Sequence, residues 1–277
     1  MLQEINSREC LACKTNISHR RGNAKYCSDK CSKSQHFRGT YCIQCGKGLI
    51  TANPKSRFCS WACINLSRNP HFNQDYFAVP NLENSYWAGF IAADGCIYRR
   101  AKGTETLSIG LQLKDKQHLI NLKSRIGAGS LSDVKHYNEN GQTYHSVTYL
   151  VYSDKICNDL GSNFNIYPQK SLTLSPPTLE GDLALAFIAG YIDGDGSYTR
   201  SKNRPRLSIV GTAEVLQWIA DIAGVEKNPQ NHKNIHEIVF HGNDAINVRK
   251  SFEQLDLPLL DRKKSRWEEL GLNLSLL

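Results

Sequence analysis

Two short phrases of the same kind, about one hundred residues apart, constrain the fold of this chain more than any other feature. Residues 87–95 read WAGFIAADG and residues 188–196 read IAGYIDGDG. Each phrase places small residues at helical spacing and ends on an aspartate followed by a glycine. Small faces let two helix backbones approach closely, but a carboxylate at a helix C-terminus is disfavoured by the helix dipole. We therefore expect two packed helices with their acidic ends side by side, compensated by a cation.

The same order of elements follows each phrase. In the first half, two strand-like runs lead to a helical stretch at 115–126, a hairpin at 130–152 and another helix. Apolar residues at helical spacing support the helix, and the NENGQ turn supports the hairpin. The second half repeats this order up to residue 255. The sequence therefore predicts an α+β fold made of two αββαββα halves.

These residues resemble the LAGLIDADG signature of homing endonucleases in their two-motif, single-chain form. The resemblance covers roughly residues 76–277, including the order of elements around each motif. It implies a pseudo-twofold pair of halves that forms a β-saddle in the DNA major groove. The two motif helices would form the internal seam, so the chain is expected to act as a monomer.

The resemblance also implies catalytic residues. The acid before the final glycine of each motif would bind Mg²⁺, which here means Asp94 and Asp195. Paired carboxylates at helix ends repel each other until a hard cation arrives. Asp193 is expected to be structural, because the first motif has Ala92 at that position. Further catalytic positions implied by the resemblance are Lys170 in YPQKSLTL, Lys264 in LLDRKKSRW with Lys263 as its close rival, and the strand residue Gln112.

Cations on the predicted strands are expected to contact DNA, some at phosphates and others at base edges. A solvated hairpin loop is the alternative interpretation of RSKNRPR at 200–206. The expected DNA-binding residues are Arg99, Arg100, Lys102, Lys114, Lys135, Arg200, Lys202, Arg204 and Arg206.

The N-terminal region carries a duplicated metal-ligand spacing. Both copies read C-x2-C-x13-C-x3-C, and the second is displaced from the first by 32 residues. Four thiolates close a tetrahedral structural zinc site, and zinc binding would supply most of the folding energy of such short segments. Cys96 and Cys157 stand outside the pattern and are expected to be ordinary buried thiols. The expected zinc ligands are Cys10, Cys13, Cys27 and Cys31 in one site and Cys42, Cys45, Cys59 and Cys63 in the other.

These features divide the chain into five expected segments. Two four-cysteine zinc modules occupy residues 1–38 and 39–66, and a linker with prolines and asparagines occupies 67–80. The two halves of the larger domain follow at 81–178 and 179–277.

Charge and composition agree with an intracellular protein that binds nucleic acid. The net charge is +8, and residues 1–80 hold twelve Lys and Arg against four Asp and Glu. No uncharged apolar run is long enough to span a bilayer, and the N-terminus lacks the apolar stretch of a signal peptide. We expect a soluble protein of the cytoplasm or nucleoid, not secreted and without a membrane partner, whose cysteines stay reduced.

The leading hypothesis is a site-specific endonuclease that cuts double-stranded DNA with Mg²⁺. The resemblance implies a role in intron mobility, a long asymmetric target and a staggered cut with short 3′ overhangs. The alternative is a non-cleaving protein of the same fold, either a maturase that binds intron RNA or a transcription regulator. An intein is disfavoured, because the chain starts with Met and ends LNLSLL without the residues that protein splicing needs. A purely structural zinc protein leaves the duplicated acidic phrases unexplained.

Overall fold

The computed structural model describes residues 8–11, 13–29, 31–32, 41–49, 56–99, 103–137 and 143–270. The chain divides into two compact units, Met1–Pro70 and His71–Leu277. Among the described residues, no helix is long and apolar enough to cross a membrane.

In the N-terminal unit, the two cysteine repeats have the same backbone hydrogen bonds, displaced by 32 residues. A serine hydroxyl accepts the backbone N–H of the last cysteine of each repeat, Ser28 for Cys31 and Ser60 for Cys63, both at 3.2 Å. Helix α2 (Trp61–Arg68) begins just after Ser60. The duplicated spacing therefore encodes a duplicated fold. The matched backbone pairs, donor first, are Cys10–Thr15 with Cys42–Lys47, Lys14–Cys10 with Gly46–Cys42, and Leu11–Lys25 with Ile43–Arg57.

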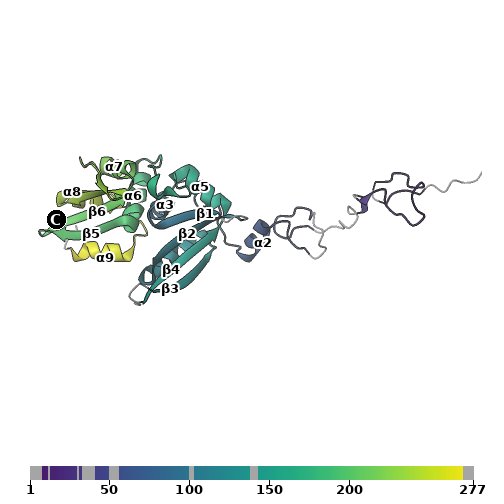
Figure 1. Ribbon diagram of the computed structural model, residues 1–277, viewed down its shortest axis with the longest axis horizontal. Helices are drawn as coiled ribbons and strands as arrows, with labels where there is room; N and C mark the ends of the chain where they lie inside the picture. The colour runs from purple at the N-terminus through teal and green to yellow at the C-terminus, as the bar shows by residue number, and fades with distance from the viewer. Residues whose placement is uncertain are drawn as a thin grey trace, which may run out of the picture. The chain divides into compact units, whose positions relative to one another are not determined.

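The larger unit contains the two predicted αββαββα halves (Figure 1). The first half is α3 (Leu82–Asp94), β1 (Gly95–Arg99), β2 (Glu105–Gln112), α4 (Lys116–Ile126), β3 (Ser130–Tyr137), β4 (Thr143–Tyr152) and α5 (Asp154–Phe164). The second half is α6 (Gly181–Asp195), β5 (Gly196–Ser201), β6 (Arg204–Gly211), α7 (Ala213–Ile222), β7 (Gln230–His232), β8 (Ile235–His241) and α8 (Asn243–Lys250). A further helix that the sequence analysis did not predict, α9 (Asp261–Glu269), lies beside β5.

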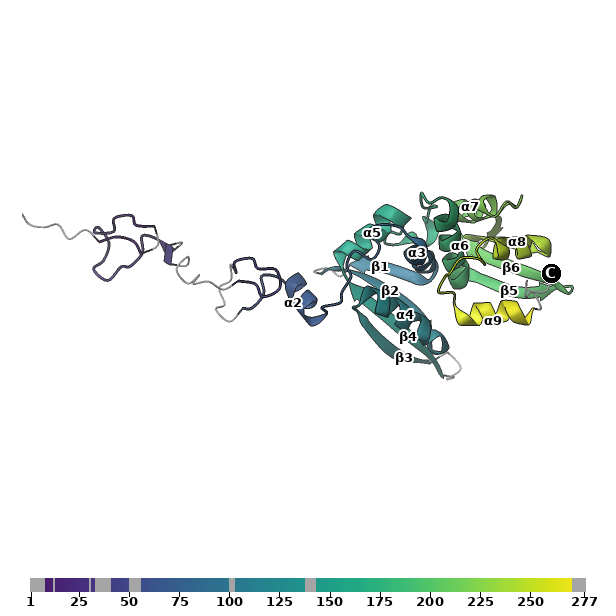
Figure 2. The same ribbon diagram turned by 180° about the vertical axis from the view of Figure 1, so that it is seen from behind.

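Each half contributes one four-stranded antiparallel sheet, and the two sheets have the same strand order. The first is β1-β2-β4-β3 and the second is β5-β6-β8-β7. Side chains alternate along each strand, so Leu107 and Ile109 face the core while Ser108 and Gln112 face the opposite way. We call this opposite side the open face of each sheet. Helices cover the other face, as α8 does along β6 (Figure 2).

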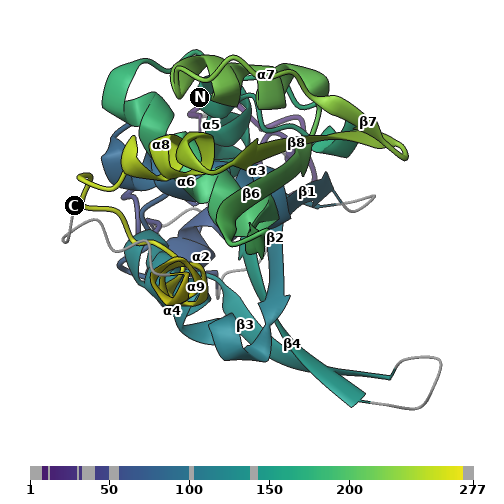
Figure 3. The ribbon, with the colours of Figure 1, turned by 90° about the vertical axis from the view of Figure 1, so that its left-hand side faces the viewer.

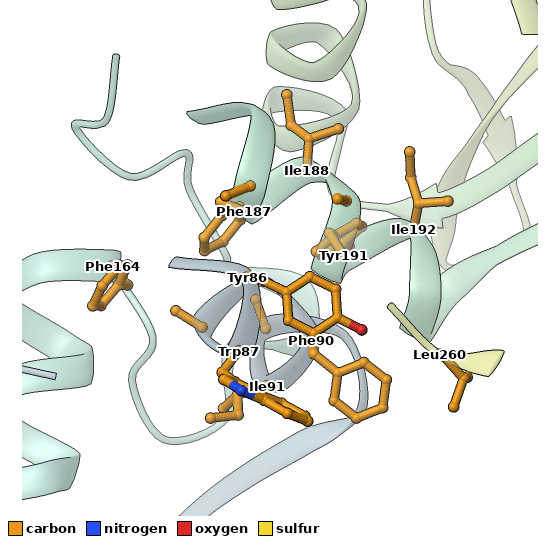
Figure 4. Close-up of a cluster of buried hydrophobic side chains, with 14 of the residues drawn as sticks. Tyr86, Trp87, Phe90, Ile91, Phe164, Phe187, Ile188, Tyr191, Ile192 and Leu260 are labelled. Carbon is orange, nitrogen blue, oxygen red and sulfur yellow. The ribbon is translucent and has the colours of Figure 1, made fainter. Parts of the chain in front are cut away.

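The two halves meet where α3 packs against α6, at the centre of the unit (Figure 1). Glycines let the two backbones touch. A Cβ on Gly89 would lie 1.9 Å from the carbonyl oxygen of Phe187, and one on Gly190 would lie 1.9 Å from that of Tyr86. Bulky side chains of both helices surround this contact (Figure 4). The predicted seam of small residues is present.

Part of the predicted linker at 67–80 packs on the first half. Phe77 is fully buried, and the Asn163 side-chain amide donates to its carbonyl oxygen at 2.8 Å. The Asn73 backbone N–H donates to Ile126 at the end of α4. From His71 onward this segment therefore belongs to the larger unit, because its aromatic side chain completes the core.

A candidate active site at the helix seam

Asp94 and Asp195 are the last residues of α3 and α6, and the packing of the two helices brings these ends together. A Cβ on Gly194 would lie 2.3 Å from the Cβ of Ala93 and 3.4 Å from an Asp94 carboxylate oxygen. Both glycines after the aspartates are extended, with φ of −88° and −83°. They are needed for space: a Cβ on Gly95 would lie 2.6 Å from the carbonyl oxygen of Ile91.

Both carboxylates lie in a setting that disfavours their charge. Burial, and after it the neighbouring Asp94, raise the pKa of Asp195 to about 6, although Lys170 and Lys263 act in the opposite direction. Burial also raises the pKa of Asp94, against the lowering effect of Lys263, Lys170 and Arg262. Oxygen ligands that repel each other in a partly dry site fit a hard divalent cation such as Mg²⁺.

Two buried lysines flank the aspartates. Lys170 begins the short 3₁₀ turn Lys170–Leu172, and its Nζ donates to the Ala93 carbonyl oxygen at 3.4 Å. Lys263, in α9, donates from Nζ to the carbonyl oxygen of Gly196. For both lysines burial lowers the pKa, while nearby aspartates act in the opposite direction. Each lysine thus reaches the end of the motif helix in its own half.

Lys263, and not Lys264, occupies the position equivalent to Lys170. Lys264 was the preferred candidate in the sequence analysis, but its side chain is exposed. Alignment on the shared Lys-Ser pair therefore selects the exposed lysine of α9 and not the buried one. On that helix Lys263 shares the buried face with Trp267 and Leu270.

A small cavity lies on the Lys170 side of the seam. It has a volume of 210 Å³, and its polar lining includes Lys170, Asp195 and Tyr191. Gln112 is exposed at the end of β2, on the open face. In the described part of the chain it has no hydrogen bond to the aspartates or the lysines.

The strand register sorts the cations predicted to bind DNA. Arg204 and Arg206 lie on the open face, and Arg206 contacts Glu237 at 3.4 Å. Arg99 points to the helix-covered face, where it contacts Asp154 of α5 at 3.2 Å. Arg200 also lies on that side and donates to the carbonyl oxygen of Leu270. The two helix-side arginines therefore tie helices to sheets, a use that differs from the predicted DNA contact.

The other predicted cations have separate positions. Lys202 and Asn203 form the tight turn between β5 and β6, with φ of 49° and 60° as a two-residue hairpin turn requires. Lys114 is exposed just after β2, and Lys135 shares the strand face of Val147. Arg100 and Lys102 lie outside the described residues.

An ion pair also joins the two halves, between residues next to the candidate site. Arg262, at the start of α9, donates from Nε to both oxygens of Asp115, at 3.1 and 3.3 Å. Asp115 belongs to the turn between β2 and α4, and its side chain is only 5% exposed. This pair spans 147 positions of sequence, and sequence reasoning missed both members.

Asp193 has the structural contacts expected of it. Its carboxylate accepts the Tyr86 hydroxyl at 2.8 Å and the Leu260 backbone N–H at 2.7 Å. The Tyr86 hydroxyl also lies 3.2 Å from Nε2 of His118. Figure 4 shows Tyr86 between the seam and Leu260. Asp193 therefore fixes the chain just before α9, whereas Ala92 in the first half has no such helix to hold.

The eight N-terminal cysteines form two clusters that fit zinc. The four sulfur atoms of each cluster lie within 4.8 Å of one another, and neighbouring pairs such as Cys13 and Cys27 are 3.4 Å apart. A tetrahedron with zinc–sulfur bonds of about 2.3 Å has sulfur–sulfur edges near 3.8 Å. Of the two cysteines outside the clusters, Cys157 is buried as predicted. Cys96 is exposed, which corrects the prediction, because it lies on the open face of β1.

Solved structures with a similar fold were found. The homing endonuclease I-WcaI bound to its DNA recognition sequence matches 77% of this chain and 95% of its own, with 14% sequence identity and a TM-score of 0.51. The chain has the homing endonuclease fold. The LAGLIDADG meganuclease I-AabMI bound to uncleaved DNA matches 71% of this chain and 92% of its own, at 11% identity and a TM-score of 0.47. Full-length DUF199/WhiA from Thermatoga maritima matches 72% of this chain and 63% of its own, at 16% identity and a TM-score of 0.45. No family model and no curated protein matches the sequence.

Within this homing endonuclease fold, the residues that sequence reasoning missed or ranked second are Asp115 in the first half and Arg262 and Lys263 in the C-terminal segment. The motif aspartates were found because each lies in a local phrase. Lys263 could have been preferred over Lys264, because the apolar residues Trp267 and Leu270 follow it at helical spacing. The contact of Arg262 with Asp115 had no local signal.

Proposed function

We propose that this protein is a site-specific endonuclease that cuts both strands of DNA with Mg²⁺ at Asp94 and Asp195. The observation that carries the proposal is the pair of carboxylates at the seam, held together by touching helix backbones and flanked by two buried lysines. A structural seam has no need of a buried carboxylate, that of Asp195, whose pKa is raised by a second carboxylate beside it.

The chain's own residues would have distinct roles. Asp94 and Asp195 would hold the metal, which when bound would activate water and neutralise charge at the phosphate. Lys170 and Lys263 would stabilise the negative charge that develops on the phosphoryl oxygens. Polar side chains of the open faces, including Gln112, Arg204 and Arg206, would contact the DNA groove.

The rest of the chain fits this activity. The two zinc modules, residues 1–38 and 39–66, would each hold one Zn²⁺ and add DNA contacts. The two halves would act as one monomer on a long asymmetric target in an intracellular compartment, leaving short 3′ overhangs and serving intron mobility. In this assignment the two halves are residues 81–178 and 179–277, and the preceding segment from His71 packs on the first half.

The test is a cleavage assay with binding measured in parallel. Purified protein is incubated with the genomic region around its own gene, and with a random duplex pool, in Mg²⁺ or in Ca²⁺. Asp94→Asn and Asp195→Asn are compared with wild type, and the DNA ends are sequenced. Asp256→Asn removes an exposed carboxylate that is not one of the proposed metal ligands and is the matched control.

A discrete double-strand cut that both seam variants abolish while binding persists would establish the nuclease. Binding without cutting, unchanged by either variant, would contradict it and favour a regulator. If the protein binds no DNA, intron RNA is the next ligand to test, as the maturase alternative requires.

A further inference from the structure

We propose that Arg262 is a phosphate-binding residue of the seam site and that only one of the two halves has it, so that the two DNA strands are cut at different rates. This inference rests on the proposed endonuclease function and deepens it.

The contacts of Arg262 leave its outer edge available to a ligand. Asp115 receives only the Nε–H of the guanidinium, at 3.1 and 3.3 Å. Within the described chain, the two terminal amino groups of Arg262 have no hydrogen-bond partner. The Asp115 side chain is 5% exposed and that of Arg262 is 41% exposed. A buried carboxylate therefore anchors the inner edge of the guanidinium, and the outer edge keeps the paired N–H groups that recognise phosphate oxygens.

Arg262 adjoins the candidate site. It precedes Lys263, and it lies between two hollows. One has a volume of 470 Å³ and is also lined by Lys114 and Lys264. The other, of 390 Å³, contains Lys263 and Gly196. Acidic residues line the same hollows, Asp115 and Asp261 in the first and Glu269 in the second. Figure 3 shows α9 beside α4, whose residues complete the larger hollow.

Arg262 also acts on the candidate metal ligands. Together with the two buried lysines it lowers the pKa of Asp94, opposing the effect of burial. A cation whose charge lowers the pKa of Asp94 would also attract a phosphate bound beside Asp94.

The first half has no counterpart of this arginine. Lys170 and Lys263 are structural equivalents, and the residue before each is Gln169 in one half and Arg262 in the other. Gln169 is exposed and has a left-handed backbone, with φ of 61°. The two halves therefore differ at the position just before the buried lysine. The substitution Arg262→Gln gives the second half the residue that the first half has there.

The experiment uses a duplex selected from a random pool by binding to wild-type protein in Ca²⁺. Either strand is end-labelled, and strand nicking is followed in Mg²⁺. We expect wild type to nick one strand faster, and Arg262→Gln to slow that strand by roughly tenfold to a hundredfold while changing the other much less. Arg262→Lys keeps the charge without the fork, so it should retain part of the rate. Asp115→Asn should reduce the bias in the same direction, because Asp115 positions the guanidinium.

Binding in Ca²⁺ gives a second readout that does not depend on cutting. Loss of one phosphate contact should reduce the slope of log affinity against log salt by about one. Lys250→Gln, which removes an exposed charge on α8, controls for net charge.

Each outcome decides the proposal. Equal nicking of both strands by wild type, or equal slowing of both by Arg262→Gln, would overturn it. If wild type binds DNA but cuts neither strand, the endonuclease proposal alone is contradicted. The salt dependence of binding then tests whether Arg262 contacts a phosphate. An unchanged slope overturns the phosphate contact, whereas a reduced slope supports it.

Discussion

At the scale of single residues, the Asp195 carboxylate proposed to bind the metal also lowers the stability of the metal-free fold. Burial and the charge of Asp94 raise its pKa to about 6 from an ordinary value near 3.8. The folded protein therefore holds the proton more tightly than the unfolded chain does. Without metal, the ionised carboxylate destabilises the fold fully above about pH 6, and this cost disappears as the pH falls below the unfolded-state pKa.

We predict that Asp195→Asn makes the metal-free site more stable while it abolishes cleavage. The free energy of unfolding should rise by about 1–3 kcal/mol at pH 8 and change little near pH 4. Urea unfolding without added Mg²⁺ measures this, with Asp256→Asn as the control. A loss of stability at pH 8 would show that the carboxylate has a stabilising partner.

The same pKa predicts how metal affinity depends on pH. Because Mg²⁺ must displace the proton from Asp195, its apparent affinity should fall as the pH drops through about 6, approaching tenfold per pH unit. Calorimetric titration with Mg²⁺ between pH 5 and 8 measures it. A flat profile in wild type would contradict the assignment of Asp195 as a ligand.

Residue identities were predictable where the signal was local. Asp94 and Asp195 each end a nine-residue phrase, and the cysteines repeat at fixed spacing, so the sequence shows them directly. The choice of Lys263 over Lys264 depends on which face of α9 is buried. The pairing of Arg262 with Asp115 depends on how the second half closes over the first, and no short-range pattern reports that.

At the scale of elements, the contact between α3 and α6 is the joint that the fold depends on. Gly89 and Gly190 each lie where a methyl group would overlap a carbonyl oxygen of the opposite helix. Backbone atoms cannot turn aside as a flexible side chain can, so relief requires the helices to separate.

We predict that Gly89→Ala or Gly190→Ala destabilises the larger unit by about 3 kcal/mol or more, as overpacking at a rigid contact does. Urea unfolding measures the change. Gly110→Ala is the matched control, because a Cβ there meets nothing within 4 Å. If the seam variants were as stable as the control, the helices would not pack as closely as described.

Element order was predictable from the sequence, but the use of each strand face was less so. The hydrophobic period and turn residues gave the strands of the two described sheets in the right order. Arg99 and Arg200 were expected at the DNA, yet each lies on the helix-covered face. Their partners are Asp154 at the start of α5 and the carbonyl group of Leu270 just after α9, and the strand pattern does not report how these helices pack.

At the scale of the whole molecule, the two compact units differ in what holds them together. The larger unit has an extensive apolar core, whereas the described apolar cluster of the second cysteine module consists of Cys42, Leu49, Cys63 and Phe58. So small a cluster cannot offset the chain entropy of a module, so metal binding must contribute.

We predict that the wild-type protein binds two zinc ions per chain. The variants Cys13→Ser and Cys45→Ser, each of which removes a ligand from one cluster, should bind one. Elemental analysis measures the content. Removal of zinc by a chelator should unfold the modules and weaken DNA binding, while the cooperative unfolding of the larger unit persists in a calorimetric scan. A wild-type chain with no bound zinc would overturn the assignment.

The internal seam also predicts a monomer, because the surface that would otherwise pair two copies is already covered. The mass in solution should stay near 31.2 kDa across protein concentrations. Sedimentation equilibrium measures it, and a mass that rises with concentration would contradict the prediction.

The touching backbones of α3 and α6 have a consequence for the DNA. Because direct contact between backbone atoms, and not the packing of flexible side chains, sets the separation of the two helix ends, the spacing of Asp94 and Asp195 has little room to adjust to different duplexes. The target would have to bend or narrow its groove to bring one phosphate of each strand to these fixed points. The cost of that deformation depends on base sequence. Base pairs at the centre of the target would then be selected by their flexibility, even where no side chain contacts them.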